Sequence, residues 1–442
     1  MSAAVNGPLN GLLSSPWRRA LLFYVALVVL IIAVAIGSGV PYTTRLLVEA
    51  AAYSLIALGL NIQWGYGGLF NFGIMGFLMI GGACVTFISY PVNDKFWHSD
   101  GPMLLGRAAI AAIVAAAIIL LARRAERIGI KGGWKNAVLV LAWFVGYIIF
   151  RSQMDPATSY IEQQAGWVGG LGLPVVLGWI FGGIVVAGVA WVVGRICLGL
   201  RTDYLAIATI GISEIIRALV KNMEWLTRGT LTVSPIRWPL PLPQDYQAMG
   251  IDTQTALIYA RGGYFLLVAA IVAVVMLLLI RAYGGPWGRM MRAIRDNYIA
   301  AGSMGKNVTA RQLEIFVLGS ILMGIGGGIL VSFTQINDPS SYQPINHTFL
   351  IWVMIIVGGA GNNWGALFGA VFIYIVWLLS EPLAQLLFGT ISNWSSALGW
   401  GAIPDIESRS LQMRVFVLGL VISIALRYAP RGLIPETAQT SR

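Results

Sequence analysis

The sequence predicts an all-α fold, a polytopic transmembrane helical bundle with about 10–12 spans. Hydrophobic residues make up 57% of the 442-residue chain and charged residues only 11%, which is about half the charged share of a typical soluble domain. Long apolar stretches recur along the chain, whereas the strands of membrane barrels alternate over about 10 residues. The composition therefore favours the lipid bilayer as the solvent and helices as the spanning elements.

Twelve apolar segments follow one another along the chain. They are 20–40, 46–62, 67–90, 108–122, 136–150, 171–193, 204–220, 263–281, 313–336, 348–360, 364–379 and 411–428. Because 348–360 and 364–379 are short and flank a Gly-rich break, we expect either two short spans or one interrupted hairpin. The pairs 46–90 and 348–379 share a pattern of helix, Gly-rich break and helix, which is typical of an internal inverted repeat.

Basic residues indicate the orientation in the membrane. If the N-terminus is cytoplasmic and the spans alternate, the inside segment 123–135 carries five Lys and Arg residues and 281–312 carries six. The longest outside connection, 221–262, carries four over a longer stretch. An excess of Lys and Arg in short loops is typical of the cytoplasmic side of a membrane protein. It accounts for the net charge of +11 without a nucleic-acid partner. We expect cytoplasmic tails at 1–19 and 429–442 around a transmembrane domain at 20–428, in a bacterial cytoplasmic (inner) membrane.

The sequence offers little for metal or covalent chemistry. Cys84 and Cys197 lie in or beside apolar segments, which is typical of packing residues. His98 and His347 have no Cys or His nearby at metal-ligand spacing. The spans lack the constellations of a membrane-embedded enzyme. We therefore expect no catalytic residues, no metal site and no cofactor.

The cytoplasmic loop 282–312 contains an amphipathic pattern that predicts a helix over 286–301. Pro286 suits a first helical turn, and Arg292 and Asp296 are spaced for an i,i+4 ion pair. One helix face is apolar: Trp287, Met290, Met291, Ile294, Tyr298 and Ala301. Such a helix either lies on the membrane surface, anchored to lipid phosphates, or docks a partner subunit.

A polar, Gly-rich break separates two of the first spans. It contains Asn61, Gln63, Tyr66, Gly67, Gly68 and Asn71. Irregular backbone at membrane depth is tolerated where protein or a water-filled cavity surrounds it, and free N–H groups there can bind a carboxylate. The break either lines a substrate pathway or is a tight turn at the inner surface.

We single out three ionisable residues within the predicted spans: Glu49, Glu214 and Arg217. Charges in a membrane are costly and often functional. Glu214 and Arg217 are spaced i,i+3, so they can pair on one helix face. The pair either stabilises a helix end or lies at a substrate pathway. We expect Glu49 to reach water near the outer end of its span.

Four blocks of sequence carry a family resemblance. They are Tyr53–Asn61 continuing to Gly65–Leu69, Leu200–Thr209 with Glu214–Arg217, Arg292–Asn297 with Ile299–Ala301 and Gly305–Thr309, and Val357–Gly365. In order and spacing these blocks resemble LivM-type permeases, the membrane subunits of ABC importers for branched-chain amino acids, over roughly 46–90 and 171–428. Residues 91–170 are an insertion with two extra apolar segments, and Ile299 stands where the wider importer motif has an acidic residue.

The resemblance implies that 282–312 is the coupling loop on which separate ATP-binding subunits dock. The residues that it assigns to coupling are Ala293, Ile294, Arg295, Asp296, Asn297, Ala300, Ala301, Gly305 and Asn307. It also implies a second permease subunit and a periplasmic or extracellular substrate-binding protein. The implied substrate is a branched-chain or related small amino acid, with urea or a short-chain amide as the alternative. A self-contained channel or secondary transporter would need ion-coupling residues, and the spans hold few.

Overall fold

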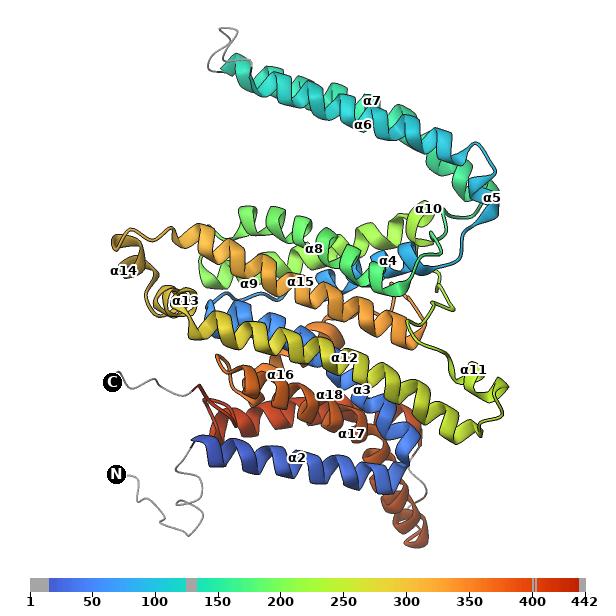
Figure 1. Cartoon of the computed structure of the whole chain (residues 1–442), viewed down its shortest axis with the longest axis vertical. Helices are drawn as coiled ribbons and strands as arrows, with labels where there is room; N and C mark the ends of the chain where they lie inside the picture. Colours follow the sequence, from blue (N-terminus) through green and yellow to red (C-terminus); the bar gives the residue numbers. More distant parts are fainter. Residues whose placement is uncertain (1–15, 125–132, 400, 402–403, 437–442) are drawn as a thin grey trace.

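The computed structural model describes residues 16–124, 133–399, 401 and 404–436. These residues are mostly helical and contain no β-strand, which confirms the all-α prediction. Among them, nine helices are long and apolar enough to cross a membrane, and two shorter apolar helices accompany these nine. Apart from two of them, which form a separate hairpin, the long helices run side by side as a bundle (Figure 1). Most of the predicted cytoplasmic loop 123–135 and parts of both tails lie outside the described residues.

Each predicted apolar segment corresponds to one main helix, although most helices begin and end at other residues than the segments do. The elements are α2 (Pro16–Ser38), α3 (Val40–Leu60), η1 (Asn61–Tyr66, a π-helical stretch), α4 (Ile74–Ser89), α5 (Asp94–Trp97), α6 (Gly101–Arg123), α7 (Gly133–Gln164), α8 (Val175–Cys197), α9 (Thr202–Asn222), α10 (Glu224–Thr227), α11 (Pro243–Ala248), α12 (Thr253–Gly284), α13 (Pro286–Asp296), α14 (Tyr298–Ser303), α15 (Val308–Thr334), η3 (Ile345–Phe349), α16 (Leu350–Gly358), α17 (Asn363–Ala397) and α18 (Ile406–Tyr428).

The centre of the bundle is built on α3 and α15. Helix α3 is buried along nearly its whole length and packs against α12, α15, α16 and α17. Helix α15 packs in addition against α4 and α8. A helix that is apolar all round suits the interior of a membrane bundle, where neighbouring helices surround it. Two short apolar helices complete this centre: α4 follows the first Gly-rich break, and α16 precedes the second.

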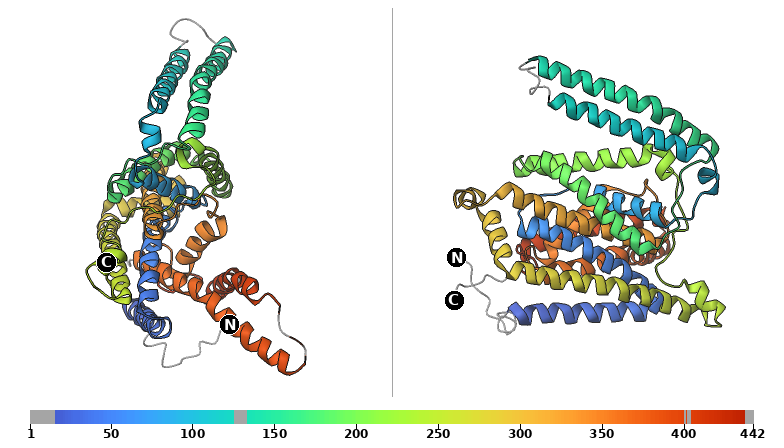
Figure 2. Two further views of the ribbon diagram at one scale, coloured as in Figure 1. Left: turned by 90° about the vertical axis from the view of Figure 1, so that its right-hand side faces the viewer. Right: turned by 45° about the horizontal axis from the view of Figure 1, so that its top comes forward.

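The predicted insertion 91–170 forms a helical hairpin that stands away from the bundle. Helices α6 and α7 pack closely against each other and contact the rest of the chain at one end, through α5 and α10 (Figure 2). A small apolar cluster of Phe96, Ile161 and Val168 holds this end. Most large apolar side chains along the hairpin are exposed, as expected of helices that face lipid.

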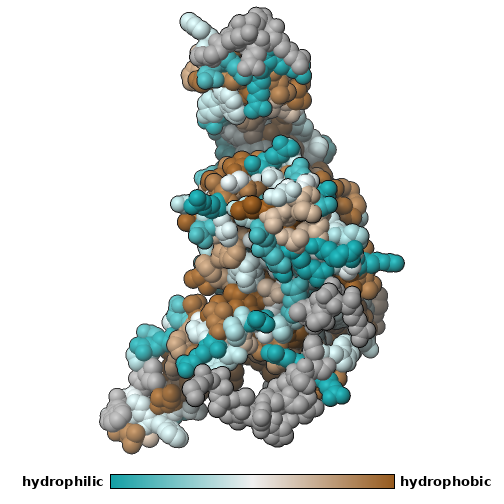
Figure 3. Space-filling model, turned by 90° about the vertical axis from the view of Figure 1, so that its left-hand side faces the viewer, coloured by the Kyte–Doolittle hydropathy of each residue, from teal (hydrophilic) through white to brown (hydrophobic). Residues whose placement is uncertain are grey.

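The two ends of the bundle differ. Helices α13 and α14 lie at the left-hand end of Figure 1, and α5, α10 and α11 lie at the right-hand end. Figure 3 looks onto the left-hand end, where hydrophilic residues gather across the middle of the face. The predicted orientation makes this end the cytoplasmic one.

Candidate functional site

Residues 286–303 form two short helices instead of the single predicted helix 286–301. Pro286 occupies the first turn of α13, where its missing N–H is not needed. The helix ends at Asp296 because Asn297 is extended, with φ at −156°. The Asn297 side chain accepts the backbone N–H of Ala300 at 3.0 Å and so begins α14. Asn is a favoured N-cap residue, which is the signal that could have located this break in the sequence.

The predicted apolar face of this segment holds it to the bundle. Met291, Ile294 and Ala301 are buried in a cluster with Tyr66 and Tyr283. The rings of Tyr66 and Tyr283 stack with centroids 3.6 Å apart. Burial of these side chains stabilises the docked position of α13 by roughly 1.5–3 kcal/mol for each large apolar side chain. Tyr298 departs from the prediction, because it is 62% exposed.

The opposite face is open to a partner. Of the residues assigned to coupling, Ile294 and Ala301 are buried within the chain and Arg295 is half-buried, whereas Ala293, Asp296, Asn297, Ala300, Gly305 and Asn307 are exposed. Three large apolar side chains beside them, Tyr298, Ile299 and Met304, are exposed as well, and neither the spacing nor the resemblance had assigned them to coupling. We define the α13–α14 surface as Ala293, Asp296, Asn297, Tyr298, Ile299, Ala300 and Met304. Aromatic residues and Met are enriched at protein interfaces, so this surface suits a protein contact.

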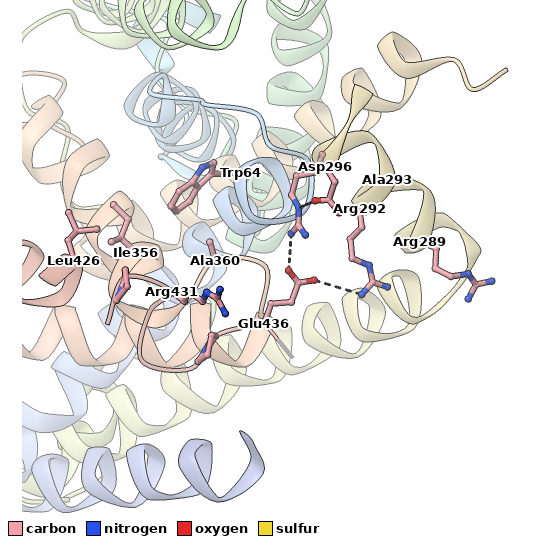
Figure 4. Close-up of a pocket in the computed structure, with 13 residues that line it drawn as sticks. Trp64, Arg289, Arg292, Ala293, Asp296, Ile356, Ala360, Leu426, Arg431 and Glu436 are labelled. Atoms are coloured by element: carbon pink, nitrogen blue, oxygen red, sulfur yellow. Dashed lines mark hydrogen bonds and ion pairs between the residues drawn. The ribbon is translucent and has the colours of Figure 1, made fainter. Parts of the chain in front are cut away.

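Glu436, in the segment that follows α18, binds two arginines of α13. Its carboxylate lies 3.0 Å from Arg295 Nη1 and 3.8 Å from Arg292 Nη1. In Figure 4 Arg292 points towards Glu436, whereas Arg289 points away. The predicted Arg292–Asp296 pair is wrong, because Asp296 pairs with Arg295 at 3.1 Å instead. Burial lowers the pKa of Arg295, but the carboxylates of Glu436 and Asp296 outweigh it, and the net pKa is raised. Arg295 therefore stays charged in this position.

A cavity of about 890 Å³ lies beside α13, between it and the C-terminal segment. That segment is pinned to the second Gly-rich break. Leu433 N–H donates to Val357 O at 2.8 Å, and Ile434 N–H donates to Gly358 O at 2.9 Å. Gly359 has φ at +121°, and a Cβ there would lie 2.4 Å from Ile434 O. Only glycine allows this approach.

The polar side chains of the first break are bonded within the protein. Asn61 Nδ2 donates to Asn363 Oδ1 at 3.0 Å. Gln63 Nε2 donates to Phe316 O at 2.7 Å, and Gln63 Oε1 accepts from Asn71 Nδ2 at 2.8 Å. All three side chains are fully buried. Burial without such partners would cost several kcal/mol for each group, so this network stabilises the irregular backbone.

The break and α13 are in direct contact. Arg295 Nη1 donates to Gly65 O at 2.6 Å. Gly68, with φ at +68°, faces the same side chain, and a Cβ there would lie 3.2 Å from Arg295 Cγ. The N–H groups of Gly67 and Gly68 both donate to Trp64 O, so in this conformation they are not free for a carboxylate. The structure thus joins the two regions that the sequence analysis treated separately.

Of the predicted intramembrane charges, Glu214 and Arg217 pair as expected, whereas Glu49 does not reach water as expected. Arg217 Nη1 lies 3.3 Å from Glu214 Oε2, which confirms the predicted i,i+3 pair. Within the described residues no hydrogen bond or ion pair connects Glu214 to the break. The prediction that Glu49 reaches water is wrong, because its side chain is buried. Arg45 and the hydroxyl of Tyr374 both bind its carboxylate there.

A family comparison and a relative aligned over most of the chain indicate the same transport system. The family described as the permease component of the branched-chain amino acid transport system matches residues 42–160 and 135–426. The chain is 24% identical over 389 residues to the probable branched-chain amino acid transport permease protein LivM of Methanocaldococcus jannaschii, which covers 87% of this chain and 90% of that protein.

Two further relatives cover less of the chain. The high-affinity branched-chain amino acid transport system permease protein LivM of Escherichia coli is 28% identical over 266 residues, covering 58% of this chain and 56% of its own. The nucleoside ABC transporter permease protein NupC of Lactococcus lactis is 28% identical over 190 residues, covering 42% of this chain and 51% of its own. No solved structure matches the chain.

Proposed function

Because this chain belongs to the family of branched-chain amino acid transport system permease components, we propose that it forms the membrane pathway of an ATP-driven importer for branched-chain or related small amino acids. Two relatives named as LivM permeases, one of them aligned over most of both chains, support this substrate class. The similarity to a nucleoside permease indicates that the family serves other solutes too. The substrate is therefore the part of the proposal that most needs measurement.

The observation that carries the proposal is the contact between α13, which carries part of the α13–α14 surface, and the first break. An ATPase subunit docked on Ala293, Asp296 and Ala300 would push or pull on α13. Arg295 would pass this movement to η1 through its bond to Gly65. ATP can switch a permease only if its binding and hydrolysis favour one of two conformations over the other. The bond from Arg295 to the centre of the bundle supplies such a link.

We assign the expected partners to the two ends of the bundle. The ATPase subunits would occupy the end with α13 and α14, and a substrate-binding protein would deliver its ligand at the other end, near α10 and α11 (Figure 1). A second permease subunit would complete the pathway. In this arrangement the chain itself is not an enzyme, and ATP hydrolysis takes place on its partners.

The test is ATP-dependent uptake into vesicles that contain the permease with its ATPase subunits and binding protein. We expect radiolabelled leucine to accumulate only with ATP and all subunits. Urea and a nucleoside, offered separately at the same concentration, measure the alternatives. Leucine uptake by the permease alone, without ATPase subunits, would contradict the proposal and favour a self-contained transporter.

A further inference from the structure

A cavity of about 350 Å³ lies in the half of the bundle opposite to α13. It is bounded by α3, α4, α15, α17, α18, η3 and the loop before η3. The last turns of α15, up to Thr334, contribute to its wall. Since α15 has 27 residues, this wall lies roughly 40 Å along the helix from α14. The volume is near the lower limit of small-ligand sites, which is about 300 Å³.

The acidic groups of this cavity are Glu49 and Asp338. Glu49 is held by Arg45 Nε at 3.2 Å and by the Tyr374 hydroxyl. Asp338 has no ion-pair partner within the part of the chain that the structure describes, and its Oδ1 accepts the backbone N–H of Ser340 at 2.8 Å. An unpaired carboxylate in a cleft between protein walls attracts a cation, such as an ammonium group, more strongly than it would in bulk water.

The arginines that line the cavity are Arg45 and Arg414. The Arg45 side chain is 56% exposed, and Glu49 takes only one of its donors. Arg414 pairs with Glu381 and lies over the ring of Trp377. Its Nε is buried, and within the described residues it has no hydrogen-bond partner. Guanidinium groups bind carboxylates in a planar, bidentate geometry, so both arginines suit a ligand carboxylate.

The rest of the lining is mainly aromatic and aliphatic, together with the polar residues Thr334, Ser341 and His347. Tyr53 stacks on Tyr374 with ring centroids 4.9 Å apart. The aliphatic side chains are Leu78, Leu330, Val331, Ile336 and Leu378. Mostly apolar walls with a few convergent charged groups are typical of small-molecule sites. Such a wall offers an apolar ligand side chain a place out of water.

We propose that this cavity binds an amino acid zwitterion on its way in from the outer face. The ammonium group lies near Glu49 and Asp338, and the carboxylate lies near Arg45 and Arg414. A structural ion pair would account for Arg45 and Glu49 alone, but not for the unpaired Asp338 in the same wall. The inference rests on the proposed function, because it assigns the substrate of that proposed transporter to this cavity.

A direct test is protection of an engineered cysteine. Ser341 lines the cavity and is exposed, so Ser341→Cys should react with an impermeant thiol reagent from outside. Leucine should slow this reaction, and 4-methylpentanoate, which lacks the ammonium group, should not. Met249→Cys, an exposed position in the loop 221–262, is the control that leucine should not protect. The native cysteines are both buried.

A second test separates a binding role from a structural one. Glu49→Gln and Asp338→Asn should each lower the initial rate of leucine uptake by at least about tenfold while the amount of assembled complex is unchanged. Asp155→Asn is the matched control for Glu49→Gln. It also removes a carboxylate from an i,i+4 pair with arginine, but on the hairpin helix α7, and should change uptake by less than about twofold.

The outcomes separate this inference from the proposed function. If the complete complex imports leucine but Ser341→Cys is unprotected and both carboxylate variants transport normally, the cavity inference is overturned and the proposed function stands. If the wild-type complex drives uptake of another solute and no amino acid, both the proposed function and the cavity inference are overturned. Protection by leucine together with loss in both variants supports the site.

Discussion

The side-chain amide of Asn61 donates a hydrogen bond to the side-chain oxygen of Asn363, 3.0 Å away and 302 residues further along the chain. The Asn61 oxygen in turn accepts the backbone N–H of Gly361 at 2.9 Å. Asn61 stands at the end of α3, and Asn363 at the start of α17. The two Gly-rich breaks, which share one sequence pattern, therefore meet inside the bundle.

Replacing Asn61 by Leu should destabilise the permease. The change leaves the Gly361 N–H and the Asn363 side chain buried without partners, at a cost of about 1–3 kcal/mol for each group. The thermal unfolding midpoint of the purified protein measures the effect. Asn222→Leu, at an exposed position near the end of α9, is the control. Equal midpoints for the two variants would show that the bond contributes nothing to stability.

Replacing Ala300 by Glu should weaken binding of the ATPase subunits by about tenfold or more, because it places a charge in the middle of the α13–α14 surface. Insertion into the membrane should be unchanged, since Ala300 is exposed. Co-purification of the ATPase subunits and vesicle uptake measure the effect. Ala248→Glu, exposed on α11 at the opposite end of the bundle, is the matched control for co-purification, which it should leave unchanged. Unchanged co-purification and uptake in Ala300→Glu would contradict the docking role.

Replacing Gly68 by Val should impair ATP-driven uptake more than it impairs assembly. A side chain at φ +68° strains the backbone by about 1–2 kcal/mol and presses on Arg295. Uptake and the amount of assembled complex are measured together. Gly262→Val on α12 is the control, because a Cβ there meets nothing within 4 Å.

The same experiment addresses the prediction that the break lines the substrate pathway. Losses of uptake and assembly in equal proportion would favour a packing role for Gly68. Normal uptake from both Gly68→Val and Asn71→Ala would remove the break from the pathway and from coupling. A selective loss in Gly68→Val with normal uptake in Asn71→Ala would favour coupling through Arg295.

The orientation can be tested with two exposed methionines at opposite ends of the bundle. Met249 is 73% exposed and Met304 is 80% exposed. In intact cells an impermeant thiol reagent should label Met249→Cys and should label Met304→Cys only after the membrane is opened. Lys131→Cys, in the basic loop 123–135, should behave like Met304→Cys. Labelling of Lys131→Cys or Met304→Cys from outside would overturn the topology.

Local features of the chain could be predicted from the sequence. The apolar segments located the helices because a long apolar run is stable in lipid only as a helix. The Glu214–Arg217 pair and most of the buried face of α13 followed from helical spacing, since residues three or four positions apart share a face. The break at Asn297 is local too, and its capping preference could have located it.

The contacts that build the sites depend on the tertiary structure. Glu436 reaches Arg295 only because the C-terminal segment crosses the second Gly-rich break. Glu49 is buried because α17 brings Tyr374 to it from 325 residues away. Spacing in one helix determines which side chains share a face, but not which distant segment covers that face. That choice is made by packing the whole bundle, where each buried polar group must find its partner.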